Sequence, residues 1–285
     1  MGGGLASRLA LITGGSRGIG LEVAKKLVAA RWDVWILARD PDRLGSARAA
    51  IVGACASGRQ RVGCLEADVA DAAGVAATVA AFLAAVGTPD LLVNSAGVAH
   101  PGLFQELDAR IFRWMMDVNY FGTVNVTRAV VPAMIARGSG HVVNISSIAG
   151  FLGVYGYSAY GASKFAVTGF SDVLRAELKP LGIDVSVVFP PDTKTEQLAY
   201  ETPFKPAVTK ALSGSSGVME PDRVADAIVR GVARKRYIIT PGSEGRILYH
   251  VHNLLGKLLY PVMDLQISRA RKRLRAHELE GSHRP

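Results

Sequence analysis

Tyr160 and Lys164 lie four residues apart in a segment that predicts a helix, so their side chains share one face. A phenol has a pKa of about 10 and can donate a proton at neutral pH, and a nearby ammonium favours the phenolate. We therefore expect Lys164 to lower the pKa of Tyr160. Such a pair suits redox chemistry on a carbonyl or alcohol, although the same spacing is also typical of a solvated helix surface.

A glycine-rich turn near the N-terminus favours the chemical interpretation. The apolar run from Leu9 to Ile12 predicts a buried strand, and the segment Thr13 to Gly20 leads from it into a helix. Glycines at 14, 18 and 20 would let the backbone approach a dinucleotide, whose pyrophosphate is attracted by the helix N-terminus.

Further motifs follow in a characteristic order: Asn94-Ser95-Ala96-Gly97, then Asn119, then Ser146-Ser147, then the Tyr160 and Lys164 pair. This order and spacing resemble the short-chain dehydrogenase/reductase family, over roughly residues 8 to 240. The resemblance implies an oxidoreductase that transfers a hydride between a nicotinamide cofactor and a carbonyl carbon.

The resemblance also implies roles for the catalytic residues. Tyr160 would protonate the developing alkoxide, Ser147 would hold the carbonyl oxygen, and Lys164 would bridge the nicotinamide ribose hydroxyls and tune Tyr160. Ser147 matches the family serine, because it precedes Tyr160 by thirteen positions, whereas Ser146 is expected to face the other way. Asn119 would anchor a water that relays protons to Lys164; a helix-kink or capping role is the alternative.

The end of the second predicted strand, Val34 to Arg39, indicates the choice of cofactor. No carboxylate stands there to bind the ribose 2′-hydroxyl of NAD, whereas Arg39 and Arg17 offer guanidinium donors suited to a 2′-phosphate. The sequence therefore favours NADPH. Arg43 is a further candidate, with a solvated surface arginine as the alternative.

Asp68 and Val69 occupy the family position that contacts adenine; a turn or helix-cap aspartate is the alternative. By resemblance, the remaining cofactor contacts are expected from the glycine turn, the Asn94 motif, the catalytic pair and the segment after the sixth strand. They are Gly14, Ser16, Gly18, Ile19, Gly20, Asn94, Ala96, Gly97, Tyr160, Lys164, Pro190, Thr193 and Thr195.

One segment departs from the general family pattern of Pro-Gly followed by threonine. Here the string is Phe189-Pro190-Pro191-Asp192-Thr193-Lys194-Thr195, so Pro191 replaces the glycine and changes the backbone that passes the nicotinamide. Within the family, this string and the Thr202 to Pro206 segment resemble 3-ketodihydrosphingosine reductases, which use NADPH to reduce a long-chain amino ketone in sphingolipid synthesis.

These side chains need a scaffold, and the chain alternates apolar strands with helical segments. Beyond those already named, strands are predicted at Val62–Glu66, Asp90–Asn94, His141–Ser146 and Asp184–Phe189, with helices beginning near Pro41, Asp71, Asp108, Ser158 and Pro221. The pattern predicts an α/β Rossmann fold with a doubly wound, mostly parallel sheet, helices on both faces and the site at the strands' carboxyl ends. With 285 residues and 49% hydrophobic content, we expect a single domain.

Two segments flank this core. Residues 190–220 hold several prolines and the polar run Ser213 to Gly217, which predicts a mobile substrate loop. The catalytic domain would span residues 1–240 and a C-terminal extension residues 241–285. In the extension, apolar residues from Ile247 to Val262 recur at helical spacing, and Pro261 is expected to kink or split the helix.

Charge gives the extension two interpretations. From residue 246 onward there are eight Lys or Arg and three Asp or Glu residues, among them Arg269, Arg271, Lys272, Arg273 and Arg275. A basic amphipathic segment suits peripheral contact with an anionic membrane. The alternative is that it packs over the substrate pocket or against another subunit. Nucleic acid binding is not expected, because the basic residues are not interleaved with aromatics.

Other features set the expected location and assembly. The N-terminal apolar run is too short for a signal peptide, so a cytoplasmic location is expected, on the cytosolic face of a membrane if the extension binds one. Cys55 and Cys64 lack metal-ligand spacing, and no metal site is predicted. The family resemblance implies a homodimer or homotetramer built through the helices near Asp108 and Ser158.

Three hypotheses remain open from the sequence. The first is NADPH-dependent reduction of 3-ketodihydrosphingosine, with Tyr160 as the general acid. The second is reduction of another lipophilic ketone, such as a steroid, a retinoid, a quinone or a 3-oxoacyl thioester. The third is a catalytically silent NADP-binding sensor or scaffold, which the intact Ser147, Tyr160 and Lys164 disfavour.

Overall fold

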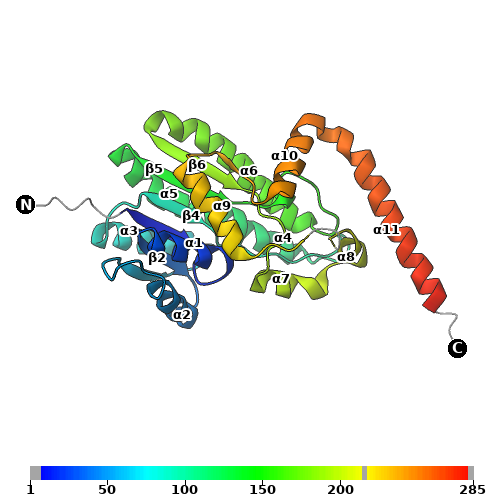
Figure 1. Cartoon of the computed structure of the whole chain (residues 1–285), viewed down its shortest axis with the longest axis horizontal. Helices are drawn as coiled ribbons and strands as arrows, with labels where there is room; N and C mark the ends of the chain where they lie inside the picture. The colour runs from blue at the N-terminus through cyan, green and yellow to red at the C-terminus, as the bar shows by residue number, and fades with distance from the viewer. Residues whose placement is uncertain (1–7, 214–216, 282–285) are drawn as a thin grey trace, which may run out of the picture.

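A parallel sheet of seven strands runs through the centre of the molecule (Figure 1). The computed structural model describes residues 8–213 and 217–281. The strand order is β3-β2-β1-β4-β5-β6-β7, and every neighbouring pair is parallel. The strands are β1 (Leu9–Thr13), β2 (Asp33–Ala38), β3 (Val62–Glu66), β4 (Leu91–Asn94), β5 (Gly140–Ile145), β6 (Ile183–Val188) and β7 (Ile238–Ile239).

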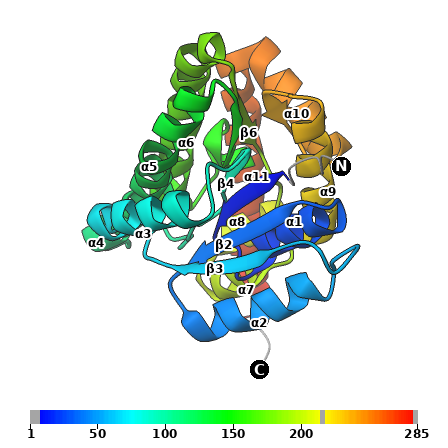
Figure 2. The ribbon, with the colours of Figure 1, turned by 90° about the vertical axis from the view of Figure 1, so that its left-hand side faces the viewer.

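Helices cover both faces of this sheet, because its central strands carry apolar side chains on both sides. In β1, Ala10 and Ile12 pack with α1, α2 and α9, whereas Leu9 and Leu11 pack with α3, α5 and α6. Figure 2 shows these two helical layers on opposite sides of the strands. Their helices are α1 (Gly18–Ala29), α2 (Pro41–Val52), α3 (Ala72–Ala85), α4 (Ala109–Met115), α5 (Gly122–Arg137), α6 (Ser158–Leu178) and α9 (Pro221–Ala233).

Side-chain caps fix where several of these helices begin. Asp40 accepts hydrogen bonds from the backbone N–H groups of residues 42 and 43, and Asp71 and Asp108 cap α3 and α4 in the same way. These starts confirm the predicted ones. The doubly wound Rossmann architecture expected from the alternating pattern is likewise confirmed.

The carboxyl ends of the central strands bring distant loops together. Thr13 Oγ1, at the end of β1, accepts hydrogen bonds from the backbone N–H groups of Ser95 and Ala96 after β4, both at 3.1 Å. Gly18 lies against the side chain of Thr195, which follows β6. The loops after β1, β4 and β6 therefore surround one hollow at the sheet edge.

Residues 190–220 were predicted as a loop, and the described part of the segment is largely helical. Thr195 caps α7 (Glu196–Glu201) by accepting a hydrogen bond from the backbone N–H of Leu198. A 3-10 turn, Thr202–Phe204, and α8 (Ala207–Ser213) follow. Of the predicted polar run, residues 214–216 lie outside the described residues.

The C-terminal extension forms two helices, α10 (Ser243–Leu255) and α11 (Tyr260–Gly281), joined by the 3-10 turn Gly256–Leu259. The predicted split at Pro261 falls earlier, at Gly256, whose φ of +52° is a conformation that glycine tolerates best. Pro261 is instead the second residue of α11, a position that proline tolerates. Within residues 8–213 and 217–281, no helix is long and apolar enough to span a membrane.

Candidate active site

The glycine turn after β1 forms a cradle that side chains would fill. Gly14 and Gly18 have φ angles of +64° and +54°, and a Cβ on Gly14 would come within 2.7 Å of the backbone nitrogen of Ala96. A Cβ on Gly20 would come within 2.5 Å of the Gly14 carbonyl oxygen. The bare backbone and the start of α1 therefore fit a dinucleotide pyrophosphate.

Three arginines line the hollow beside this cradle. Arg39 lies just past the end of β2 and pairs with Asp68 at 3.4 Å. Arg17 and Arg43 both pair with Glu196 Oε2, at 3.1 and 2.7 Å. Arg43 therefore lines the same cavity as Arg17 and Arg39. This position favours a cofactor contact over the alternative of a solvated surface arginine.

Asn94, which is predicted to contact the cofactor, has its side chain in the packed interior of the sheet. Its side chain is buried and donates to Thr127 Oγ1 at 3.0 Å and to Asn144 Oδ1 at 2.9 Å. The amide therefore braces β4 against β5 and α5, and among the described residues Ser95, Ala96 and Gly97, rather than Asn94, line the cavity. Asn94 lies on the strand itself, so its side chain points into the sheet packing.

Ser147 and Tyr160 meet at the centre of the cavity. Ser147 begins a 3-10 turn, Ile148–Gly150, and its side chain hydrogen bonds to that of Tyr160. Ser146 faces the other way: it is buried and lies 3.0 Å from both Lys164 O and Thr168 Oγ1 on α6. The alternation expected at the end of the strand thus places Ser147, and not Ser146, against Tyr160.

The pKa of Tyr160 is raised in this structure, not lowered as expected from Lys164 alone. Burial raises the pKa of Tyr160 above its ordinary value and the Glu201 carboxylate raises it further, against hydrogen bonds from Ser147 and Gln197. Lys164 Nζ donates to Ile145 O at 2.9 Å and lies 5.7 Å from the centre of the Tyr160 ring. Burial lowers the pKa of Lys164 to about 8.

Asn119 lies in a π-helical turn, Met116–Phe121, between α4 and α5. Its Oδ1 accepts from the Val98 N–H at 2.8 Å, and its Nδ2 donates to Val98 O and to Ser163 Oγ, both at 2.9 Å. A Cβ on Gly97 would lie 3.2 Å from Asn119 Oδ1 and 3.5 Å from Lys164 Nζ. Asn119 therefore occupies a kinked helix next to Lys164, while its side chain ties the loop after β4 to α6.

The proline-containing segment after β6 closes the cavity opposite the glycine turn. Pro190 O accepts from the Ile148 N–H at 3.2 Å, and Thr193 Oγ1 donates to Pro191 O at 2.8 Å. Asp192 and Lys194 both bond to the backbone of Met219. Pro191 thus lies in a loop braced on both sides, and Pro190, Thr193 and Thr195 all line the cavity.

The cavity encloses about 1900 Å³, more than the ~300–1,000 Å³ typical of a single small-molecule site. Its lining includes the glycine turn and the three arginines, and it also includes Tyr160 and, on α10 and α11, Leu248, Tyr249 and Met263. The C-terminal extension therefore contributes to the cavity wall, which was one of its two predicted roles.

Sequence reasoning did not identify Gln197 and Glu201, which line the cavity beside Tyr160. Their spacing of four residues was the available signal, because i and i+4 side chains on a helix lie together. In a segment predicted to be a loop, a spacing of four residues does not indicate a shared helix face.

Comparison with known proteins matches this arrangement to one family. The family model described as short chain dehydrogenase matches residues 8–205. A relative from Danio rerio named 3-dehydrosphinganine reductase is 37% identical over 239 residues, which cover 84% of this chain and 72% of the relative. The resemblance to the family and to these reductases is thereby confirmed.

Solved structures support the same assignment. A short-chain dehydrogenase from Sphingobium yanoikuyae in complex with NADPH has a TM-score of 0.74 and 30% identity, covering 90% of this chain and 95% of its own. A short-chain dehydrogenase/reductase from Burkholderia phymatum in complex with NAD has a TM-score of 0.76 and 25% identity. The match covers 91% of this chain and 95% of the other chain. The cavity described above is thus of a kind that holds a nicotinamide cofactor.

Proposed function

Because the chain belongs to the short-chain dehydrogenase family, we propose that it is an NADPH-dependent reductase of 3-ketodihydrosphingosine, forming dihydrosphingosine. The observation that carries the proposal is that Tyr160 and Ser147 line one cavity together with the glycine turn, the arginines and residues of α10 and α11. A cofactor along the glycine turn and a long apolar chain toward α10 and α11 would meet at these two side chains. The similarity to relatives named for this reaction supports the substrate.

In the proposed reaction Tyr160 is the general acid. NADPH held along the glycine turn would supply the hydride that the ketone carbon receives. As the carbon receives the hydride, the electron pair of the carbon–oxygen π bond moves to the oxygen, which takes the proton of the Tyr160 hydroxyl. Ser147 holds that oxygen in place. The raised pKa of Tyr160 keeps the phenol protonated but makes it a weaker acid, so the phenolate needs stabilisation as the proton leaves.

Lys164 and Asn119 would restore the proton. With a pKa lowered to about 8, Lys164 stays protonated at neutral pH yet releases a proton more readily than a free lysine. Its ammonium would stabilise the Tyr160 phenolate formed in the reaction. Asn119 keeps the loop around Gly97 beside Lys164, where the ribose hydroxyls of the cofactor would lie.

The preference for NADPH over NADH is supported by the three arginines. Arg17, Arg39 and Arg43 come from the glycine turn, the end of β2 and α2, and all line the cavity. A planar guanidinium binds a phosphate with paired hydrogen bonds, so this cluster suits the 2′-phosphate that only NADPH carries.

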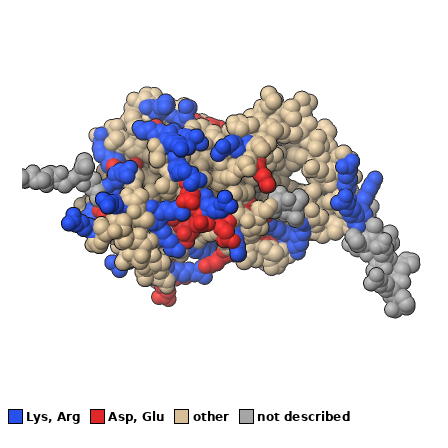
Figure 3. Space-filling view, viewed as in Figure 1, with Lys and Arg blue, Asp and Glu red and all other residues tan. Residues whose placement is uncertain are grey.

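We also propose that the extension contacts a membrane on its cytosolic face. An apolar ridge on α10, the following turn and α11 is formed by Ile247, Leu254, Leu258, Val262 and Leu265, with Leu254 84% and Leu258 74% exposed. Arg269, Arg271, Lys272 and Arg273 are exposed further along α11. Figure 3 shows the mostly uncharged surface over α10 and the Lys and Arg side chains toward the end of α11. An anionic bilayer would bind both features.

The substrate is tested by following NADPH absorbance with purified protein in detergent. We expect oxidation with 3-ketodihydrosphingosine to exceed that with a steroid ketone or a 3-oxoacyl thioester. A preference for either competitor would contradict the substrate while leaving the reductase chemistry in place.

A further inference from the structure

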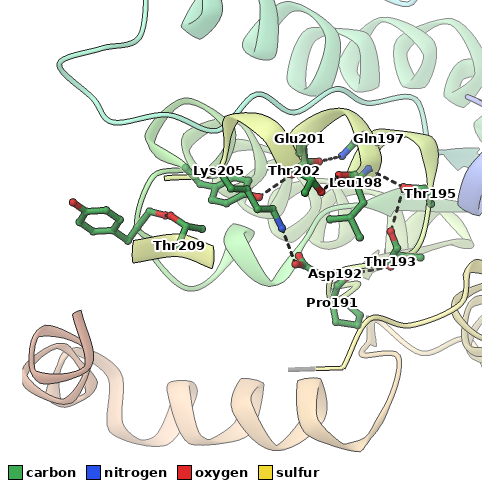
Figure 4. A network of polar contacts seen from close by, with 12 residues as sticks. Pro191, Asp192, Thr193, Thr195, Gln197, Leu198, Glu201, Thr202, Lys205 and Thr209 are labelled. Atoms are coloured by element: carbon green, nitrogen blue, oxygen red, sulfur yellow. Dashed lines mark hydrogen bonds and ion pairs between the residues drawn. The ribbon is translucent and has the colours of Figure 1, made fainter. Parts of the chain in front are cut away.

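The carboxylate of Glu201 is part of the cavity wall that holds Tyr160. Glu201 is the last residue of α7, and its side chain is buried, with 6% of the residue exposed. Its Oε2 accepts from the Tyr157 hydroxyl at 2.8 Å and its Oε1 accepts from Gln197 Nε2 at 2.9 Å. Figure 4 shows Gln197 and Glu201 joined along one face of α7.

This carboxylate is closely linked to the proposed general acid. The ring centroids of Tyr157 and Tyr160 are 5.7 Å apart, and Gln197, which donates to Glu201, also lowers the pKa of Tyr160. All four side chains line the cavity. A group held by Glu201 would therefore lie next to the carbonyl that Tyr160 protonates.

Within the described part of the chain, no cation pairs with Glu201, whose two hydrogen-bond donors are neutral. Lys205 comes from the same segment, but its Nζ pairs with Asp192 at 2.9 Å, as Figure 4 shows, and Lys205 is not among the described lining residues. Lys164 Nζ donates to Ile145 O. Burial raises the pKa of Glu201, and the charge of Lys205 opposes this shift only in part. A cation arriving with the substrate would supply the missing charge.

We propose that Glu201 is a specificity residue that binds the ammonium group of an amino ketone whose amino carbon adjoins the reacting carbonyl. This inference rests on the proposed function and deepens it. A primary amine beside a ketone would place its nitrogen within a few atoms of the oxygen held by Tyr160 and Ser147. A neutral steroid ketone gains nothing from the carboxylate, so Glu201 selects amino ketones among lipophilic ones.

The test compares two ketones: 3-ketodihydrosphingosine and the same chain with hydrogen in place of the amino group. We expect wild-type kcat/KM to favour the amine by between about 10-fold and 100-fold, the range of a hydrogen bond to a charged group. Glu201→Gln keeps the shape and removes the charge, so it should abolish this preference, read as the ratio of kcat/KM for the two ketones; any effect of the substitution on Tyr160 acts on both ketones and cancels in the ratio.

Two control variants separate charge from structure. Tyr157→Phe removes a donor to Glu201 and keeps the carboxylate, so the preference for the amine should persist. Glu177→Gln makes the same acid-to-amide change at an exposed position on α6 and should change neither ketone. If Glu201→Gln slows both ketones equally, or if wild-type protein reduces both equally well, the ammonium site is refuted while the reductase function stands.

A binding measurement decides the inference apart from turnover. In the presence of NADP⁺, calorimetry would compare octylamine with octanol, and we expect Glu201→Gln to weaken only octylamine, by about 10-fold or more. If wild-type protein reduces neither ketone, the proposed substrate is wrong, and this comparison still tests the ammonium site. Octylamine binding that does not change on substitution would refute it.

Discussion

At the scale of single residues, burial sets the chemistry more than sequence neighbours do. Lys164 is four residues from Tyr160, yet the pKa of Tyr160 is raised, because the phenol lies in a cavity with the Glu201 carboxylate nearby. A raised pKa keeps the phenol protonated near neutral pH and also makes it a weaker acid. We expect the Lys164 ammonium to offset this cost as the phenolate forms.

Replacing Tyr160 tests its role as the acid. Tyr160→Phe should lower kcat by about 10²-fold to 10⁴-fold, the usual contribution of general acid catalysis, because the lost proton donor acts in the transition state. NADPH affinity, followed by cofactor fluorescence, should stay nearly the same. The exposed Tyr260 provides a control, since Tyr260→Phe should leave turnover unchanged. Full activity of Tyr160→Phe would contradict the assigned role.

His141, at the start of β5, predicts a dependence of stability on pH. Burial lowers its pKa to about 4, and its Nε2 lies 2.7 Å from Ser186 Oγ. The unfolded chain binds this proton below pH ~6.5, whereas the folded protein does so only near 4, so stability is lost as pH falls between these values. From pH 8 to pH 5 the loss should be about 2 kcal/mol.

Urea unfolding at both pH values measures this loss. His141→Asn removes the titrating group, so its free energy of unfolding should fall less than that of the wild type over the same interval. Equal pH dependence in the two proteins would show that His141 is not the group responsible.

At the scale of elements, the site is assembled from the ends of strands that are distant in sequence. The glycine turn after β1, Arg39 after β2, Ser147 after β5 and α7 after β6 converge because the strands are parallel and their carboxyl ends meet at one edge. Glu196 on α7 ties Arg17 and Arg43 together across this convergence. The cofactor region therefore depends on the glycine turn, α2 and α7 together.

The choice of cofactor tests this convergence. Arg39→Asp should shift the preference from NADPH toward NADH, because a carboxylate repels a 2′-phosphate and can bind a 2′-hydroxyl. The measurement is kcat/KM for each cofactor. Arg128→Asp, at an exposed position on α5, should leave the ratio unchanged. An unchanged ratio in Arg39→Asp would mean that Arg17 and Arg43 dominate.

At the scale of the whole molecule, the extension has two faces with different environments. Leu248, Tyr249 and Met263 line the cavity, while the apolar ridge faces outward. Figure 1 shows α11 running beside α8 and away from the sheet. Closing the cavity and contacting a membrane are thus compatible roles.

Membrane contact is tested by sedimentation with phosphatidylserine liposomes. The double variant Leu254→Ser and Leu258→Ser should bind more weakly, because the serines remove apolar surface from the ridge. High salt should weaken wild-type binding as it screens the α11 basic residues. Val52→Ser, an exposed apolar residue on α2, serves as the control. Equal binding of wild type and double variant would contradict the ridge as a membrane contact.

The sequence by itself determined the strand and helix alternation, the glycine turn, the order of the motifs and the choice of Ser147 over Ser146. These features depend on residues within a few positions of one another, where periodicity and backbone preference act directly. It could not determine the burial of Asn94, the raised pKa of Tyr160 or the place of Arg43 beside Arg17. Nor could it place Glu201 beside Tyr160, since α6 and α7 meet only when parallel strands pack. Tertiary structure decided these, because burial and long-range proximity are properties of the packed chain.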